Sequence, residues 1–229
     1  MNRTKIEWCD FTWNPITGCL HGCWYCYAKK LFTRFHRSFE PTFYPERLDE
    51  PAKLKQPAKI FCCSVADIFA DWTKTEWRNA VLSELPKYPQ HIFQLLTKQP
   101  QNINMKPMEN VWVGATITCE DEMENMYSLV NNYGGLKFLS FEPLLSPVFI
   151  CLTDGYIDKI DWIIVGKLTG SKKVPLDKEA VRYIIRTAHE KGIPIFLKNN
   201  LGWNETIQEY PKPKREGVGR GDFEVGEDL

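Results

Sequence analysis

The segment from residue 162 to residue 197 opens with Trp162-Ile163-Ile164-Val165 and closes with Ile193-Pro194-Ile195-Phe196-Leu197. Both runs are typical of buried strands, because branched and aromatic residues fill them and each is too short for a helix. Between them, Asp177 to Lys191 has a helical pattern, with apolar side chains on one face and Gly192 at its end. The segment therefore predicts a strand–helix–strand unit with parallel strands and a right-handed crossover.

The same alternation extends toward the N-terminus. Four more apolar runs predict strands: Ile60-Phe61-Cys62-Cys63, Ile92-Phe93-Gln94-Leu95-Leu96, Val111-Trp112-Val113 and Lys137-Phe138-Leu139. Helical patterns cover Thr75 to Leu85 and Glu120 to Val130, and a further strand is expected within Lys5 to Phe11. Six or seven strands are fewer than the eight of a closed barrel. We expect an α/β fold, an incomplete (β/α)6-like TIM barrel with parallel strands; an open doubly wound sheet is the alternative.

Length and composition favour one globular domain with an extension. The 229 residues are 43% hydrophobic and 13% aromatic, which excludes a disordered, collagen-like or coiled-coil chain. We place the barrel at residues 1–203 and a C-terminal extension at residues 204–229. The extension is rich in turn residues, with Pro211 and Pro213 followed by Gly217, Gly219 and Gly221.

Charge and hydropathy exclude two further classes. Lys plus Arg and Asp plus Glu both number 29, so the whole chain is not a general polyanion binder, although a local basic patch is compatible with this balance. Residues 1–7 contain no apolar signal segment, and no run approaches 18 uncharged apolar residues. We expect no membrane span and a cytoplasmic protein.

Three of the eight cysteines form a spaced group in Gly18-Cys19-Leu20-His21-Gly22-Cys23-Trp24-Tyr25-Cys26-Tyr27, a C-x3-C-x2-C loop over residues 18–27. At the cysteine frequency of this chain, such a triad arises by chance in about one sequence in a hundred. Three thiolates can ligate three irons of a [4Fe–4S] cluster and leave the fourth open for a ligand. Cys19, Cys23 and Cys26 are therefore candidate metal ligands.

A structural zinc site is the alternative for this loop. Zinc needs a fourth ligand, for which Cys9 or His21 is available, but no second pair with finger or ribbon spacing follows. The remaining cysteines, Cys62, Cys63, Cys119 and Cys151, are expected to be small core residues.

Polar residues that follow the predicted strands are the other candidates, since ligands of α/β folds bind at the carboxyl ends of the strands. They are Ser64, Asp67, Thr97, Lys98, Thr116, Thr118, Glu142, Lys167, Thr169, Lys198 and Asn199.

The cysteine loop, with an aromatic residue before its last cysteine, resembles that of the radical SAM superfamily. More narrowly, the chain is similar to a phage- and prokaryote-associated branch with radical-SAM-like cysteines. The blocks that carry this resemblance are Ile6-Glu7-Trp8, Trp13 to Cys19, Cys26-Tyr27-Ala28, Ser64 to Phe69, Leu96-Thr97-Lys98, Asn110 to Gly114, Phe138 to Leu145 and Asp161 to Gly166. The chain departs from that branch in its shorter first cysteine gap and in Gly166-Lys167-Leu168-Thr169-Gly170, where the branch has Gly-Gly-Glu-Ser-Gly.

The resemblance implies an enzyme that cleaves S-adenosylmethionine reductively at a [4Fe–4S] cluster and directs a 5′-deoxyadenosyl radical to a substrate that the sequence does not identify. It implies an electron donor such as flavodoxin or ferredoxin. By the same resemblance, Ser64 and Asp67 receive the methionine ammonium, Thr116 or Thr118 meets the ribose hydroxyls, and Glu142 lies beside the sulfonium or a substrate amine.

A rival interpretation rests on the segment that follows the triad. Lys29, Lys30, Arg34, His36 and Arg37 alternate there with Phe32, Phe35 and Phe39, a composition typical of a nucleic-acid contact helix. Nucleic acid is therefore a possible substrate of an enzyme. The same residues also fit a non-enzymatic zinc or iron–sulfur module that binds nucleic acid.

Overall fold

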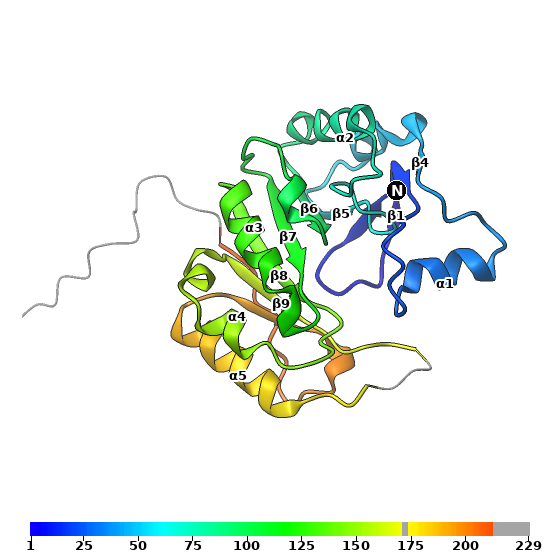
Figure 1. Ribbon diagram of the computed structural model, residues 1–229. Helices are drawn as coiled ribbons and strands as arrows, with labels where there is room; N and C mark the ends of the chain where they lie inside the picture. The colour runs from blue at the N-terminus through cyan, green and yellow to red at the C-terminus, as the bar shows by residue number, and fades with distance from the viewer. Residues whose placement is uncertain (171–173, 213–229) are drawn as a thin grey trace, which may run out of the picture.

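The computed structural model describes residues 1–170 and 174–212. Its main feature is an eight-stranded sheet with the order β1-β2-β5-β6-β7-β8-β9-β10 (Figure 1). The strands of this sheet are β1 (Asn2–Arg3), β2 (Phe11–Trp13), β5 (Lys59–Cys62), β6 (Ile92–Thr97), β7 (Val111–Thr116), β8 (Leu136–Phe141), β9 (Trp162–Val165) and β10 (Ile195–Leu197). A separate antiparallel pair joins β3 (Ile16–Thr17) to β4 (Thr42–Phe43).

The order of the strands makes the sheet a partial barrel. From β2 to β10 every neighbouring pair is parallel and follows the chain order, and only β1 pairs antiparallel, with β2. A doubly wound sheet reverses its strand order near the middle, and this sheet does not. Right-handed crossovers in one direction place the helices that connect these strands on one face. The predicted incomplete barrel is confirmed, and the doubly wound alternative is wrong.

The outer face of the barrel is covered by α2 (Thr75–Leu82), α3 (Glu124–Asn132), α4 (Phe149–Thr153) and α5 (Lys178–Glu190). Helix α1 (Tyr27–Arg34) follows the cysteine loop and buries only Ala28. Short 3-10 turns lie at Pro45–Arg47, Glu50–Lys53, Leu85–Lys87, Pro100–Asn102, Glu120–Glu122, Gly155–Lys159 and Asn199–Leu201. The α5 helix begins as predicted, because the Asp177 carboxylate accepts hydrogen bonds from the N–H groups of Glu179 and Ala180. Its predicted apolar face is buried against the sheet at Val181 and Ile184.

The first strand lies later than the sequence predicts. The expectation was a strand within Lys5 to Phe11, whereas β2 covers Phe11–Trp13. Residues ahead of it turn instead, since the Cys9 N–H donates to the Ile6 carbonyl and brings the Trp8 side chain into the barrel interior.

Aromatic rings fill the amino end of the barrel interior. We call Trp8, Phe61, Trp112, Phe138, Trp162 and Phe196 the aromatic plug. The ring centroids of Trp8 and Phe61 lie 4.7 Å apart, and those of Trp112 and Trp162 lie 5.6 Å apart. Since Trp112 and Trp162 are among the first two residues of their strands, the plug leaves the carboxyl ends of the strands for other contacts.

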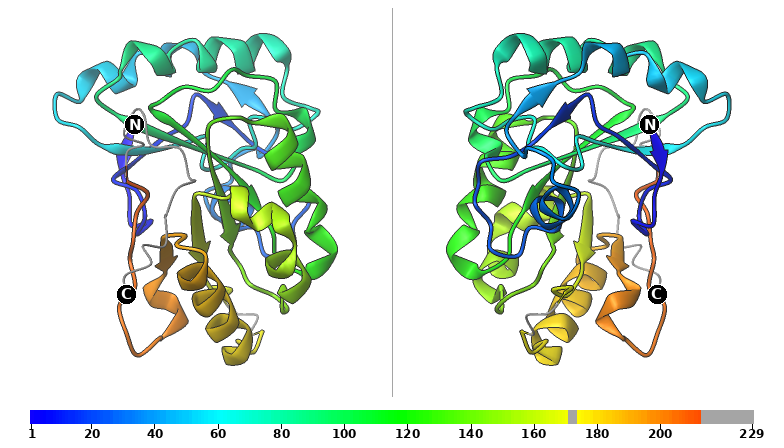
Figure 2. Two further views of the ribbon diagram at one scale, coloured as in Figure 1. Left: turned by 90° about the vertical axis from the view of Figure 1, so that its left-hand side faces the viewer. Right: turned by 90° about the vertical axis from the view of Figure 1, so that its right-hand side faces the viewer.

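The first residues of the predicted extension pack on the barrel. Glu209 N–H donates to the Ile195 carbonyl, and the Tyr210 ring stacks on Trp162 with centroids 5.4 Å apart. The Tyr210 hydroxyl reaches the Glu7 carbonyl, so this segment runs beside the N-terminal residues (Figure 2). The division at residue 203 stays a prediction, and its turn-rich part, with Gly217, Gly219 and Gly221, lies outside the described residues. No helix in the described ranges is long and apolar enough to cross a membrane.

Candidate active site

The carboxyl ends of the strands surround a cavity of about 420 Å³. The three triad cysteines line it from the loop that follows β2 and β3. Ser64, Thr116 and Glu142 line it from the carboxyl ends of β5, β7 and β8. The parallel sheet therefore brings the cysteine loop and the predicted strand-end residues to one place.

A glycine fixes the start of the cysteine loop. Gly18 has φ +86°, and a Cβ at this position would lie 2.2 Å from the carbonyl oxygen of Glu40. Its N–H donates to the Val65 carbonyl, and the next N–H, of Cys19, donates to the Phe39 carbonyl. Only glycine fits this close approach of two backbones.

The last cysteine of the triad also begins a helix. The Cys26 Sγ accepts a hydrogen bond from the Lys29 N–H at 3.3 Å and caps α1. The Cys26 N–H in turn donates to the Cys23 carbonyl, which closes a turn between the two cysteines. Burial raises the pKa of the Cys19 thiol to about 12, which favours the neutral thiol as long as no cation lies beside it. Positive charge at the loop is needed to convert it to a thiolate ligand.

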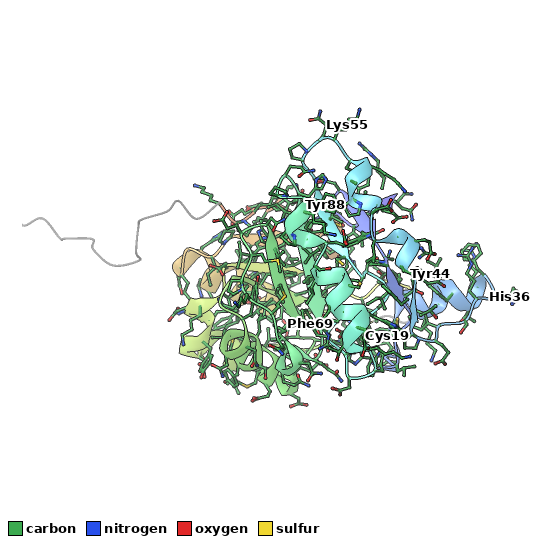
Figure 3. All side chains as sticks on the ribbon, turned by 90° about the horizontal axis from the view of Figure 1, so that it is seen from above. Cys19, His36, Tyr44, Lys55, Phe69 and Tyr88 are labelled. Carbon is green, nitrogen blue, oxygen red and sulfur yellow. The ribbon has the colours of Figure 1, made fainter. Side chains whose placement is uncertain are left out.

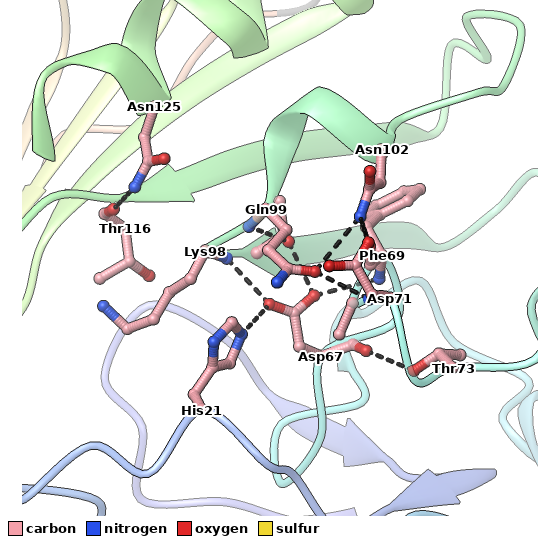
Figure 4. A network of polar contacts seen from close by, with 12 residues as sticks. His21, Asp67, Phe69, Asp71, Thr73, Lys98, Gln99, Asn102, Thr116 and Asn125 are labelled. Carbon is pink, nitrogen blue, oxygen red and sulfur yellow. Dashed lines mark hydrogen bonds and ion pairs between the residues drawn. The ribbon is translucent and has the colours of Figure 1, made fainter.

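Asp67 lies beneath the loop at the centre of a polar network (Figure 4). Its Oδ1 accepts from Phe69 N–H at 3.0 Å and from the Thr97 hydroxyl at 2.7 Å. Its Oδ2 accepts from Lys98 N–H at 2.9 Å and lies 2.8 Å from the His21 Nε2. Both oxygens of this buried carboxylate are therefore engaged within the protein, and the contact with His21 holds the cysteine loop.

The other predicted ligands differ in what they face. Thr116 lines the cavity, but Thr118 does not, because its N–H and hydroxyl both donate to the Glu122 carboxylate. Ser64 lines the cavity and donates its hydroxyl to the side-chain oxygen of Asn14. Thr116 and Thr118 were predicted as alternative contacts for the ribose, and of the two only Thr116 lines the cavity.

Glu142 forms an ion pair with Lys198 in the cavity wall. Gly166 lies against both side chains, and a Cβ there would be 2.9 Å from the Lys198 Cδ and 3.2 Å from the Glu142 Cγ. Because Gly166 has no side chain, the side chains of Glu142 and Lys198 have space to pair beside it. Of the other strand-end candidates, Thr97, Lys98, Lys167 and Thr169 line the cavity, and Asn199 does not.

Two polar groups of the cavity lack a hydrogen-bond partner among the described residues. The Ser140 hydroxyl is fully buried and lines the cavity, and the Lys98 Nζ is buried nearby, 5.5 Å from the centre of the Tyr25 ring and 4.0 Å from the Glu122 Oε1. Sequence reasoning missed Ser140. The signal was present, since alternation along β8 places Ser140 on the same face as Phe138 of the aromatic plug.

The donors near the cysteine loop can be compared with the needs of a zinc ion and of a cluster. Within residues 1–170 and 174–212, no three His, Cys, Asp or Glu side chains are close enough together to hold one metal ion. Of the two proposed fourth zinc ligands, Cys9 packs with the aromatic plug and His21 is engaged by Asp67. Three thiols in one cavity wall are the number of protein ligands that a [4Fe–4S] cluster with one open iron requires. Cys62, Cys63 and Cys151 are buried and Cys119 is half-buried.

Comparison with known proteins gives a family and a fold. The family model described as "Protein of unknown function (DUF5131)" matches residues 3–221. No curated protein matches the chain in sequence. The structure of spore photoproduct lyase complexed with dinucleoside spore photoproduct has a TM-score of 0.61 at 10% identity, over 86% of this chain and 78% of that one. A variant of that lyase with bound AdoMet and dinucleoside spore photoproduct has a TM-score of 0.58 at 9% identity, with the same coverage. The chain shares the partial-barrel fold of that enzyme.

Proposed function

The chain belongs to the DUF5131 family, and we propose that it is a radical SAM enzyme. The observation that carries the proposal is the position of Cys19, Cys23 and Cys26 in the wall of a cavity at the carboxyl end of a partial barrel. The shared fold with spore photoproduct lyase, of which one structure holds AdoMet, supports it. Membership of the phage- and prokaryote-associated branch stays a prediction.

We propose that the three cysteines hold a [4Fe–4S] cluster and leave one iron for S-adenosylmethionine. When bound, the cluster would supply the electron that cleaves the cofactor. The protein's residues would orient the cofactor and keep water away from it. The donor, by this proposal, is a flavodoxin or ferredoxin.

The polar residues of the cavity are the proposed cofactor contacts. Ser64 is the proposed contact for the methionine part of the cofactor. Of Thr116 and Thr118, only Thr116 is kept as the proposed ribose contact, because Thr118 donates both its N–H and its hydroxyl to Glu122. Glu142, paired with Lys198, is placed to meet a positive group of the cofactor or of a substrate. For Asp67 we propose support of the loop through His21 in place of the ammonium contact, because its oxygens already accept hydrogen bonds within the protein.

Anaerobic reconstitution tests the proposal. We expect about four irons and four sulfides per chain, a broad absorbance near 400 nm, and slow formation of 5′-deoxyadenosine after strong reduction. Cys19→Ala, Cys23→Ala and Cys26→Ala should each lose iron, because two thiols are too few to hold the cluster. Cys119→Ala is the matched control, since Cys119 is a half-buried thiol that does not line the cavity.

Two results would overturn the proposal. One zinc per chain in place of iron would identify the non-enzymatic zinc module. A full cluster that yields no deoxyadenosine, while a known radical SAM enzyme is active in parallel, would identify a non-enzymatic iron–sulfur module.

A further inference from the structure

Helix α1 exposes a face that combines apolar and basic side chains. We call Tyr27, Lys30, Leu31, Arg34 and Phe35 the α1 face; their spacing of three, four, seven and eight residues places them on one side of the helix. Such an apolar stripe normally packs on a core. Here Tyr27 is 52% exposed, Leu31 44% and Phe35 58%. The helix turns this stripe outward, and the only residue that it buries is Ala28.

The α1 face begins at the cavity and leads away from it. Tyr27 lines the cavity and donates its hydroxyl to the Ser64 carbonyl at 2.6 Å. From there the helix runs outward past Phe35, and His36, just beyond its end, lies at the outer edge of the molecule, whereas Cys19 lies toward the barrel (Figure 3). A ligand that covers this face therefore reaches the cavity mouth at one end.

Positive charge is concentrated here although the whole chain is neutral. From Phe11 to Phe39 the sequence contains no Asp or Glu. The salt bridges among the described residues include none from Lys30 or Arg34. Helix α5 differs, because its Arg182 and Arg186 each pair with a glutamate of the same helix. The cations of α1 are thus available to an anionic partner.

The basic residues continue across the mouth of the cavity. The Lys30 Nζ lies 3.6 Å from the position that a Cβ would take at Gly170, so α1 approaches the loop that follows β9. That loop contributes Lys167 to the cavity lining. A polyanion on the α1 face would therefore meet positive charge from the helix to the mouth of the cavity.

We propose that the α1 face binds single-stranded nucleic acid and brings it to the mouth of the cavity. Phosphates fit the cations, and unpaired bases offer flat apolar faces to the exposed rings of Tyr27 and Phe35. In a duplex the bases stack on one another, so their flat faces are not open to protein side chains. An acidic protein would pair with the cations but has no regular series of flat rings to stack on Tyr27 and Phe35. The inference deepens the proposed function, on which it rests, by naming the class of substrate.

Fluorescence anisotropy with a labelled oligo(dT) of about 12 nucleotides tests this on the full-length protein. Lys30→Gln/Arg34→Gln should weaken binding about ten-fold, as expected for two exposed ion pairs. It should lower the slope of log Kd against log salt by about 1.4. Phe35→Ala should weaken binding roughly 5- to 150-fold through lost stacking. Arg182→Gln/Arg186→Gln removes the same charge from α5 and should leave Kd within about two-fold.

Three results would overturn the inference: a Kd that the α1 variants do not change, an equal loss in the α5 variant, or a duplex that binds as tightly as the single strand. An acidic flavodoxin that binds through Lys30 and Arg34, without competition from the oligonucleotide, would assign the face to the electron donor instead. Oligonucleotide binding without deoxyadenosine formation would refute the proposed function alone. Deoxyadenosine formation without binding that depends on α1 would refute only this inference.

Discussion

Replacing Asp67 by Asn separates a supporting role from a cofactor contact. An amide has one acceptor oxygen, so the side chain can no longer accept from both Phe69 N–H and Lys98 N–H, which now bond to different oxygens of Asp67. One of these N–H groups would face an NH₂ group in a buried site. A buried donor without a partner costs about 1–3 kcal/mol, and the loss of charge on the remaining hydrogen bonds adds to this. We expect the free energy of unfolding to fall by about 2–4 kcal/mol.

Urea unfolding followed by circular dichroism measures this change, and in a chain of this size it corresponds to roughly 4–16 °C in Tm. Asp71→Asn is the matched control, because Asp71 is exposed and its carboxylate accepts from Asn102; we expect a change within about 0.5 kcal/mol. The reasoning is refuted if Asp67→Asn keeps full stability. If calorimetry of that variant also shows a 10- to 150-fold weaker affinity for S-adenosylmethionine, the carboxylate is the ammonium ligand after all.

Three further changes test other parts of the structure. Gly18→Ala should destabilise the protein by more than about 3 kcal/mol or release the cysteine loop, since its Cβ would meet the Glu40 carbonyl; urea unfolding and iron content after reconstitution distinguish these from no effect. Lys198→Met should cost about 1–3 kcal/mol at pH 7 by leaving Glu142 unpaired in a partly buried site, and adding Glu142→Gln should recover part of this loss in urea unfolding. Burial raises the pKa of Tyr133 to about 12, above its unfolded value of about 10, so its contribution to stability is complete below pH 10 and is lost as the pH rises toward 12. Tyr133→Phe should make the fall in unfolding free energy between about pH 10 and 12 smaller, because it removes the part due to this tyrosine, and an unchanged fall would contradict the assignment.

The strands of the barrel were predictable because parallel strands with both faces buried are continuous apolar runs. The run Trp162 to Val165 is identical to β9, and the other runs begin within two residues of their strands. The strand β2 was misplaced, because Phe11–Trp13 is only three residues long and has Thr12 at its centre. Such a strand exists through its pairing with β5, which local sequence does not reveal.

The site was predictable in position and less so in detail. Because parallel strands end at one edge, their polar ends were expected to meet, and most of them line one cavity. Local sequence did not show that His21 contacts Asp67, 46 positions away, or that Thr118 bonds to Glu122. Which way a side chain faces at a strand end depends on the loop that follows, and no periodicity encodes it.

For the proposed enzyme, the aromatic plug has a consequence for the order of events during turnover. It fills the amino end of the barrel, so a molecule in the deep part of the cavity, beside Ser140, enters and leaves by the mouth at which the cysteine loop lies. Two ligands that share one entrance bind in sequence, with the deeper one arriving first and departing last. Steady-state kinetics should accordingly follow a compulsory order, and an excess of the outer ligand should slow turnover by trapping the inner one.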